Sequence, residues 1–441
     1  MSQVLMKLFS TNGEAPTATL QDAIMSGQAP DGGLYLPEQL PQIDCTSHQD
    51  KSFQEIALSV ASHFFTDIQS DRLSHIIQQA FPFAPKTIEL DPQISVMELF
   101  HGPTLAFKDF GARFMAQIMS YYTETSAESA KKLTILVATS GDTGGAVASA
   151  FHKVPNIDVV ILYPSGMVSE LQEKQLTTFG DNIYAIEVEG TFDDCQKFVK
   201  SAFRDEGFNK SFKLTSANSI NIARLIPQSF YYFAAVASLQ KDNLVFSVPS
   251  GNFGNVAAGL MASLMGMPVK HFISATNRNG KVVSDYLKTG VFEPKSSVST
   301  ISNAMDVGNP SNLARIQNFY NSDIPKITDN LSVPYFTDEE TKIAINEVKE
   351  QYDYLMCPHT AVGYLGAKQH LAKNPDNHIV IAATAHPAKF KSEVDTLMDI
   401  PLPPELASLI DLKKEASKVE NDYQQIKSTV YQLLGLSLIH I

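Results

Sequence analysis

The sequence predicts an α/β fold in which parallel sheets are covered by helices on both faces. From about residue 132 onward, short apolar runs rich in β-branched residues alternate with segments of helical periodicity. The runs are almost continuously apolar, which is typical of strands that are buried on both faces. Polar, glycine-bearing loops follow several of the runs directly, and ligands in such folds bind at the carboxyl ends of strands. These loops are therefore the expected location of a functional site.

The individual elements follow from the same patterns. The expected strands are 133–138, 158–163, 183–188, 212–215, 243–248, 269–275 and 378–383. The expected helices are 53–65, 73–80, 110–121, 146–152, 169–179, 192–203, 222–239, 256–265 and 339–351. Residues 1–95 differ in composition from the rest and end in a proline-rich break, so we expect a separate helical N-terminal unit. Residues 396–441 are charged, with an apolar end at 433–441, and are expected to be helical.

Composition excludes several classes of protein. The chain has 441 residues, 44% of them hydrophobic and 18% charged, which is typical of a globular protein of more than one domain. Its net charge of −13 argues against a nucleic-acid partner, because phosphate backbones require a basic face. Three separated cysteines indicate free thiols in a reducing compartment, and no set of residues suggests a metal site. Without a signal peptide or a membrane span, we expect a cytoplasmic protein.

One lysine stands in an unusual setting, in His101-Gly-Pro-Thr-Leu-Ala-Phe-Lys-Asp-Phe110. Gly102 and Pro103 end any preceding helix, and a new helical pattern starts close to Lys108. An amine among apolar neighbours loses hydration, which favours its neutral, nucleophilic form. The alternative is a lysine whose stem packs on apolar surface while its charge stays in water.

Two loops share one design, each joining a buried strand to the start of a helix. The first, Ser140-Gly-Asp-Thr-Gly-Gly145, carries Asp142, which would repel a phosphate, so Thr139, Ser140 and Thr143 are expected to hold polar groups of a small substrate. The second, Ser250-Gly-Asn-Phe-Gly-Asn255, has no acidic residue, and its free amides suit a phosphate. Neither is a Rossmann or Walker A motif. Either loop alone could be a structural turn, capped by Asp142 or Asn252.

Arg224 is the one charge in the apolar run Ile222-Ala-Arg-Leu-Ile226, and Asn218 lies six residues before it. A buried guanidinium needs an anionic partner, which is either an internal carboxylate or a substrate phosphate. Thr384 ends the last expected strand, where its hydroxyl faces the same edge or bonds a strand carbonyl. A desolvated lysine together with a glycine-rich phosphate loop suggests pyridoxal phosphate as cofactor.

Six motifs carry a resemblance to a known family. They are His101–Phe110, Ala138-Thr-Ser-Gly-Asp-Thr-Gly144, Ser216-Ala-Asn-Ser-Ile-Asn221, Val248-Pro-Ser-Gly-Asn-Phe-Gly254, Ser302-Asn-Ala-Met-Asp306 and Thr384-Ala-His-Pro-Ala-Lys-Phe390. Together with Asp31-Gly-Gly-Leu-Tyr-Leu-Pro37, they make the chain resemble, over nearly its full length, the bacterial-type threonine synthases, which are fold-type II pyridoxal-phosphate enzymes.

This resemblance implies a fold and a division of the chain. The fold would comprise two doubly wound open α/β domains and an N-terminal unit over 1–95. Residues 96–395 would form the catalytic region, with a smaller α/β subdomain inserted at roughly 128–218. Residues 396–441 would form a C-terminal helical segment.

The resemblance also implies roles for single residues. Lys108 would bind the cofactor aldehyde through an imine, and Gly251, Asn252, Phe253, Gly254 and Asn255 would hold its phosphate. Thr384 would bond the pyridine nitrogen. Asp142 stands where many fold-type II enzymes have an Asn against the cofactor ring, so its bond to the cofactor hydroxyl stays open. Thr139, Ser140 and Thr143 would bind the substrate's polar groups, while Asn218 and Arg224 would bind its phosphate.

The implied activity is that of a carbon–oxygen lyase that acts on phosphates. It would convert O-phospho-L-homoserine and water to L-threonine and phosphate, in a monomer or homodimer. A serine/threonine dehydratase or an amino-acid phosphate lyase would use the same cofactor parts without adding water at Cβ. A catalytically inert phosphometabolite-binding protein would have the same loops and is the second alternative.

Overall fold

The larger of two parallel sheets confirms the α/β expectation. The computed structural model describes residues 5–125, 132–391 and 400–435. Seven strands form this sheet in the order β12-β11-β10-β14-β5-β4, with β13 beside β11. They are β4 (Lys86–Asp91), β5 (Ile94–Glu98), β10 (Leu244–Pro249), β11 (His271–Asn277), β12 (Leu331–Ser332), β13 (Tyr335–Phe336) and β14 (His378–Ala383). All pairs are parallel except β4 with β5.

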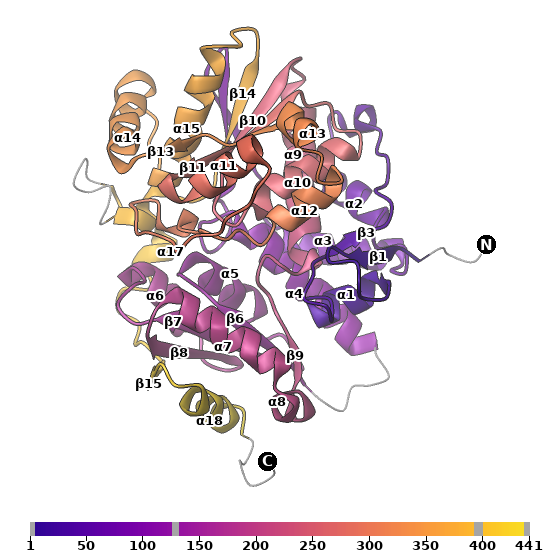
Figure 1. Cartoon of the computed structure of the whole chain (residues 1–441), viewed down its shortest axis with the longest axis vertical. Helices are drawn as coiled ribbons and strands as arrows, with labels where there is room; N and C mark the ends of the chain where they lie inside the picture. Colours follow the sequence, from indigo (N-terminus) through magenta and orange to yellow (C-terminus); the bar gives the residue numbers. More distant parts are fainter. Residues whose placement is uncertain (1–4, 126–131, 392–399, 436–441) are drawn as a thin grey trace.

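A second, entirely parallel sheet of five strands lies in the lower half of Figure 1. Its order is β15-β8-β7-β6-β9. The strands are β6 (Leu133–Ala138), β7 (Ile157–Pro164), β8 (Ile183–Glu189), β9 (Lys213–Thr215) and β15 (Ser417–Glu420). The two sheets correspond to the two open α/β layers that the resemblance implies, and β6 and β14 have the bounds expected from the sequence.

Helices cover both faces of each sheet, which explains why the strands are apolar throughout. In β10, Phe246 and Val248 face one hydrophobic core, while the preceding Val245 faces another. β6 repeats this arrangement: Ile135 and Leu136 belong to different cores. Because successive side chains point to opposite faces of a strand, a sheet that is covered twice needs apolar residues at every position.

The expected helices are present, and several unexpected ones join them. Those of the two α/β layers are α4 (Lys108–Thr125), α5 (Asp142–Phe151), α6 (Glu170–Thr177), α7 (Phe192–Arg204), α8 (Glu206–Ser211), α9 (Ile222–Leu239), α10 (Gly254–Leu264), α11 (Lys281–Thr289), α12 (Leu313–Phe319), α13 (Ile324–Asn330), α14 (Asp338–Tyr352) and α15 (Pro358–Leu371). α15 is buried along most of its length against β10, β11 and β14. It has no polar face, so it shows none of the amphipathic periodicity that identifies a surface helix.

The N-terminal unit is only partly helical, which corrects the expectation for residues 1–95. It contains α1 (Leu20–Ser26), α2 (Phe53–Ser62) and α3 (Ser70–Ala80). It also contains an antiparallel sheet of β2 (Ala18–Thr19), β1 (Lys7–Ser10) and β3 (Tyr35–Pro37). Strands of two to four residues are too short to show an alternating pattern, so only their pairing reveals them.

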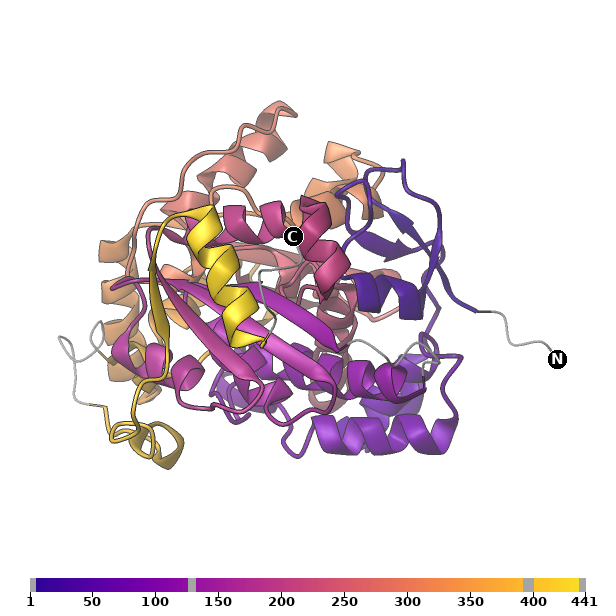
Figure 2. The same cartoon turned by 90° about the horizontal axis from the view of Figure 1, so that it is seen from below.

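The C-terminal segment is also not purely helical within its described part. A short helix, α17 (Pro404–Ala407), is followed by β15, which extends the smaller sheet beside β8, and by α18 (Tyr423–Leu433). Figure 2 shows this segment in yellow, running across the smaller sheet. The charges of β15 had suggested a helix, but Lys418 pairs with Glu189 of β8 at 2.7 Å while Val419 is buried. Most of the apolar end at 433–441 lies outside the described residues.

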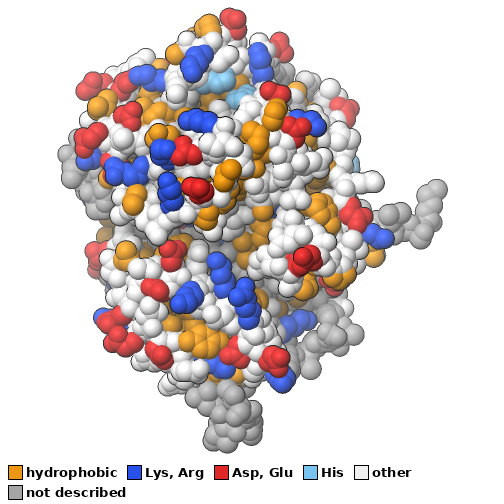
Figure 3. Space-filling model, in the orientation of Figure 1, with side chains coloured by type: hydrophobic (Ala, Val, Ile, Leu, Met, Phe, Trp, Pro, Cys, Tyr) orange, Lys and Arg blue, Asp and Glu red, His pale blue; other side chains and the backbone are white. Residues whose placement is uncertain are grey.

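On the face shown in Figure 3, acidic and basic side chains are intermixed. Across residues 5–125, 132–391 and 400–435, no helix combines the length and apolarity that crossing a bilayer requires.

Candidate active site

The loops after four parallel strands converge at one edge of the larger sheet and the facing edge of the smaller one. The loop after β5 is tied to the loop after β14, because Phe107 N donates to Thr384 O at 2.8 Å and His386 N donates to Leu105 O at 3.0 Å. The end of β6 is joined to the segment between β9 and α9, where Asn218 Nδ2 donates to Ala138 O at 2.9 Å. The glycine loops, Lys108 and Thr384 thus lie at carboxyl ends of strands, as the sequence predicts.

Asp109 has a structural role that the sequence left unexplained. Its carboxylate is fully buried and accepts hydrogen bonds from Thr104 N at 2.9 Å and Thr104 Oγ1 at 2.6 Å. A Cβ at Gly102 would lie 2.5 Å from Asp109 Oδ2, so only glycine fits there. Asp109 therefore holds the turn that places Lys108 at the first position of α4.

Lys108 occupies a nearly dry position with little opposing charge. Its side chain is 15% exposed, its Nζ lies 6.0 Å from the Phe107 ring centre, and Asp142 Oδ2 is 4.0 Å away. Burial lowers the pKa of Lys108 to about 8, since the raising effect of Asp142 is opposed by Lys389 and Arg224. The amine is thus available in its neutral form near neutral pH.

Only one of the two phenylalanines that flank the lysine lies against its amine. Phe110 instead packs edge-on with Phe53, Phe83 and Tyr231, within the core between α4, α9 and the N-terminal unit. Of the two phenylalanines, only Phe107 therefore shields the Lys108 amine from water.

Asp142 is buried, and its charged form is stabilised by Lys389, a residue to which the sequence analysis assigned no role. Lys389 Nζ lies 2.8 Å from Asp142 Oδ1, and Gln172 Nε2 donates to the same oxygen at 2.9 Å. Burial opposes ionisation, but the ammonium groups of Lys389 and Lys108 outweigh it and hold the pKa of Asp142 below its usual range. Lys389 stands in the Thr384–Phe390 motif, although nothing in the local pattern separates it from a surface lysine.

The loop between β6 and α5 divides its three hydroxyls between two tasks. Thr139 Oγ1 accepts hydrogen bonds from Gly141 N at 3.0 Å and Gly144 N at 2.8 Å, so this hydroxyl shapes the loop itself. Ser140 and Thr143 are half-buried, and within the described part of the chain their hydroxyls make no hydrogen bond. Ser140 and Thr143 are thus the hydroxyls left for a substrate.

The loop between β10 and α10 has the features of an anion cradle. Phe253 has φ = 59°, in the left-handed region that a bulky residue rarely adopts, immediately before the free amides of α10. Asn255 Oδ1 accepts hydrogen bonds from Tyr231 at 2.6 Å and Tyr232 at 2.7 Å. Its Nδ2 is buried without a partner among the described residues. A buried amide donor that lacks an acceptor fits a phosphate oxygen.

A second loop covers this cradle. A Cβ on Gly251 would lie 2.7 Å from Met305 Cα and 3.0 Å from Ala304 O, both backbone atoms, so the two loops can approach only at a glycine. Ala304 N donates to His359 Nε2 at 3.1 Å. His359 starts α15, and burial lowers its pKa to about 4, so it is a neutral acceptor.

Arg224 and Asn218 lie where the sequence places them, around the start of α9. Arg224 is buried, and its Nη1 donates to Ala217 O at 2.6 Å, while its Nε has no partner among the described residues. Within the same residues it forms no ion pair, and burial lowers its pKa to about 10. Within the described residues, no carboxylate makes an ion-pair contact with Arg224, and Asp109 acts on it only through a longer-range attraction.

A polar cluster that the sequence reading missed joins the two phosphate-type regions. Asn252 Nδ2 donates to Ser219 Oγ at 2.7 Å, and Asn312 Nδ2 donates to Asn252 O at 2.9 Å. Arg315 is fully buried and donates to Ser219 O at 2.9 Å and Ile220 O at 2.6 Å. Its run Leu313-Ala-Arg-Ile316 repeats the apolar setting of Arg224, a signal that could have identified it.

Thr384 lies directly after β14 and is buried. Its carbonyl accepts the bond from Phe107 N, and within the described residues its hydroxyl makes no hydrogen bond. The hydroxyl is therefore open to a ligand.

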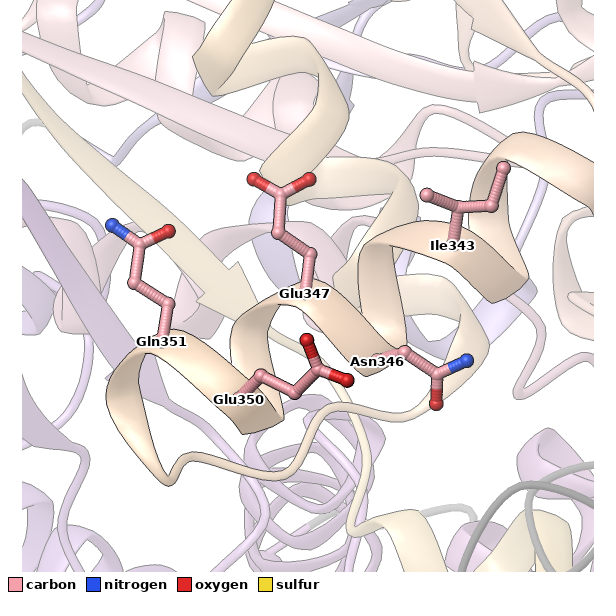
Figure 4. A pocket seen from close by; sticks show the side chains of 5 residues that line it. All are labelled: Ile343, Asn346, Glu347, Glu350 and Gln351. Atoms are coloured by element: carbon pink, nitrogen blue, oxygen red, sulfur yellow. The ribbon is translucent and has the colours of Figure 1, made fainter.

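These features fit a phosphate-bearing aldehyde cofactor better than they fit a metal ion. The Asn255 amide that lacks a described partner, the left-handed Phe253 and the crowded Gly251 form a cradle for an anion, and Lys108 supplies an amine whose lowered pKa makes its neutral form accessible. Over the described ranges, no three His, Cys, Asp or Glu side chains group closely enough to hold a metal. A surface depression on α14, lined by Ile343, Asn346, Glu347, Glu350 and Gln351, involves none of these residues (Figure 4).

Family models account for nearly the whole chain. One described as "Pyridoxal-phosphate dependent enzyme" matches residues 85–385. Two others, "Threonine synthase N terminus" and "Threonine synthase, C-terminal", match residues 7–81 and 360–430.

Individual proteins agree with these matches. The chain is 42% identical to threonine synthase of Buchnera aphidicola subsp. Baizongia pistaciae over 96% of this chain and 99% of the relative, and 41% identical to that of Escherichia coli over 96% and 98%. The solved E. coli threonine synthase superposes with a TM-score of 0.90 at 39% identity, covering 97% of this chain and 100% of that one. A pyridoxal-phosphate-bound threonine synthase from Brucella melitensis gives 0.89 at 35% identity, covering 97% and 99%.

More distant structures share the fold alone. Maize serine racemase, for example, superposes with a TM-score of 0.54 at 15% identity, covering 74% of this chain and 97% of that one. The threonine synthases match over nearly the full length, with higher identity and TM-score. From these matches and the geometry above, we conclude that the chain belongs to the threonine synthase family of pyridoxal-phosphate-dependent enzymes.

Proposed function

We propose that the protein converts O-phospho-L-homoserine and water to L-threonine and phosphate, with pyridoxal phosphate as cofactor. The observation that carries this proposal is a second position that needs an anion. The amide-lined loop 251–255 suits the cofactor phosphate, while the buried Arg224 guanidinium forms no ion pair within the described residues. A dehydratase acting on serine or threonine has no need of that second phosphate position.

Residues of the chain divide the task of holding the cofactor. Gly251, Asn252, Phe253, Gly254 and Asn255 would hold its phosphate, Thr384 would bond its ring nitrogen, and Lys108 would bind its aldehyde carbon. Asp142 would face the ring from the smaller sheet. When bound, pyridoxal phosphate supplies an electron sink for the negative charge that develops at the substrate Cα.

Lys108 then acts as the base. Its poorly hydrated amine has a pKa of about 8, close enough to neutrality to accept the Cα proton and return it later. In the net reaction a second proton leaves Cβ, the Cγ–O bond to phosphate breaks, Cγ gains a proton and water adds at Cβ. The nearly dry surroundings of Lys108 exclude competing water until this last addition.

The substrate is held by groups around the start of α9 and the first glycine loop. Arg224 and Asn218 would bind the substrate phosphate and stabilise its charge as it leaves. Ser140 and Thr143, whose hydroxyls make no hydrogen bond within the described residues, would bind the substrate's carboxylate and other polar groups. Thr139 supports them from below, since its own hydroxyl is engaged by Gly141 N and Gly144 N.

Product analysis with O-phospho-L-homoserine tests the activity directly. We expect threonine and phosphate in equal amounts, and a keto acid without threonine would instead assign a dehydratase. Borohydride reduction should trap the cofactor on the peptide that contains Lys108. Substrate binding without any turnover by the cofactor-loaded chain would favour the phosphometabolite-binding alternative. A Lys108→Ala variant with full turnover would remove Lys108 from the catalytic role.

Arg224→Ala tests the substrate phosphate site. It should weaken a phosphorylated substrate analogue by about 100-fold, because a charge-assisted bidentate pair contributes roughly 3 kcal/mol, and should weaken the unphosphorylated analogue far less. Equal losses for the two analogues would remove Arg224 from this role.

We extend the proposal to the organisation of the chain. Residues 1–95, 96–395 (with a subdomain at roughly 128–218) and 396–441 would be its three parts. It would act in the cytoplasm as a monomer or homodimer, with a small-molecule substrate and no nucleic-acid partner. The net charge of −13 supports the last point.

A further inference from the structure

Two lysines face a single carboxylate at the centre of the site. Lys389 Nζ lies 2.8 Å from Asp142 Oδ1 and is entirely shielded from solvent. Lys108 Nζ lies 4.0 Å from the other oxygen, Oδ2, and its side chain is 15% exposed. The fully buried lysine thus has the short contact, while the lysine assigned to the chemistry has the long one.

Lys389 is held in this position by the scaffold. It belongs to the short helix η4 (Pro387–Phe390) after β14, and its Nζ also donates to Thr104 O at 2.7 Å. Gln172 of α6 fixes the same Asp142 oxygen from the smaller sheet. Lys389 and Asp142 therefore connect the turn before Lys108 to the first glycine loop, and both side chains have defined partners.

The charges around Lys108 come from every element packed against it. Asp142 of α5 is negative, while Lys389 of η4 and Arg224 of α9 are positive. His359 of α15 is neutral, because burial lowers its pKa to about 4. Asp109, the next residue in the chain, is engaged by Thr104. One facing carboxylate is thus shared among several cations.

We propose that Lys389 is a positioning residue that takes Asp142 as its own ion-pair partner and so leaves the Lys108 amine without a compensating negative charge. The inference rests on the proposed role of Lys108 as the reacting amine. It explains how this chain tolerates an acid beside that lysine: Asp142 alone would favour the ammonium form, and Lys389, in the shorter contact with Asp142, opposes that effect.

The test measures the protonation of Lys108 directly, without substrate. The full chain, freed of its cofactor, is labelled with a trace of acetic anhydride across a pH series, and acetylation of the Lys108 peptide is followed by mass spectrometry. Only the neutral amine reacts, so the midpoint reports the pKa of Lys108 and is expected near 8 in the unaltered chain. Since no turnover is measured, a failure of this inference is distinguishable from a failure of the proposed function.

Lys389→Gln removes the charge and keeps a donor for Thr104 O. We expect the Lys108 midpoint to rise by at least about one pH unit, because Asp142 then pairs with Lys108. The rate of recombination with pyridoxal phosphate at neutral pH should fall about tenfold in parallel. Lys153→Gln, at a lysine whose side chain is 69% exposed, should leave both values unchanged. An unchanged midpoint in a folded Lys389→Gln variant would overturn the proposal.

The double variant Asp142→Asn/Lys389→Gln separates charge from structure. It removes a pair of zero net charge, so the Lys108 midpoint should return to within about half a pH unit of the unaltered chain. If Asp142 were instead the working partner of Lys108, the double variant would drop the midpoint by about one unit or more, and the proposal would be wrong. This comparison decides the matter even if Lys389→Gln alone does not fold.

Discussion

The two glycine loops are built on one backbone plan, yet they serve opposite electrostatic tasks. Each follows a buried parallel strand and opens a helix, α5 in the smaller sheet and α10 in the larger. The first loop contains Asp142, ion-paired with Lys389, and the second contains no charge but a buried Asn255 amide without a described partner. A helix start favours any anion, so the side chains of the loop decide whether a phosphate is accepted or refused.

Gly251→Ala should produce the largest effect, because backbone atoms of the covering loop leave no room for a Cβ in the uncharged loop. We expect the Kd for pyridoxal phosphate to rise about 100-fold, near the upper end of the roughly 3 kcal/mol that overpacking costs. Gly254→Ala is the matched control: its Cβ would have ordinary contacts with Asn312 Nδ2 at 3.4 Å and Ser219 Cβ at 3.5 Å. Comparable losses in both variants would show that crowding by Met305 is not the cause.

His359 connects the loop that covers Gly251 to the charges near Asp142, and its burial should appear as a pH dependence of stability. Its pKa in the folded chain, about 4, lies below the ordinary 6.5, so on acidification the unfolded chain takes up the proton first. The free energy of unfolding should therefore fall by about 2 to 3 kcal/mol as pH drops from 6.5 to 4 on account of this residue.

His359→Gln should make this decline shallower in denaturant titrations across the same pH range. The exposed His75 offers the control, since His75→Gln should retain the original steepness. A His359→Gln variant that declines as steeply as the unaltered chain would contradict a buried neutral histidine.

Introducing a carboxylate into the uncharged loop tests whether side-chain charge decides if a phosphate is accepted. Asn255→Asp keeps the acceptor for Tyr231 and Tyr232 but places a carboxylate against the proposed phosphate, and we expect a loss of about 2 kcal/mol, roughly 30-fold in Kd for pyridoxal phosphate. The affinity for pyridoxal, which lacks the phosphate, should stay nearly constant. If both ligands are weakened alike, loop 251–255 does not hold the phosphate.

The smallest expected difference concerns the hydroxyl at the start of each loop. Thr139 Oγ1 accepts from two loop amides, whereas Ser250 Oγ makes one bond, to Val248 O at 2.9 Å. Thr139→Val should lower the free energy of unfolding by about 2 kcal/mol, and Ser250→Ala by about 1 kcal/mol, because unpaired buried amides cost more than one lost hydroxyl bond. Thermal and denaturant unfolding would measure both, and the reverse order would argue against Thr139 as the support of its loop.

Much of the fold follows from local patterns. The strands β6 and β14 have the expected bounds because strands that are buried on both faces read as continuous apolar runs. Shorter or fully buried elements were not predicted. β1 and β3 are too short to show a periodic pattern, and α15 has no polar face. In β15, local charge suggested a helix, but pairing with β8 overrides it.

The site could be predicted in part, for a similar reason. Lys108 and the two glycine loops stand out by composition alone, and the arginine in the apolar run of α9 was identified from its setting. Arg315 has the same setting but no family motif beside it. Its partners Ser219 and Ile220 lie about a hundred positions away, so its role becomes visible only in three dimensions.

The sequence by itself determined the residue types and the loops in which the chemistry is placed, since a glycine-rich turn between strand and helix is a local property of the chain. The tertiary structure alone decided how their charges combine. Lys389 meets Thr104 across 285 positions of sequence and shares Asp142 with Lys108. Ionisation depends on burial and on distances between charges, which a one-dimensional pattern does not contain.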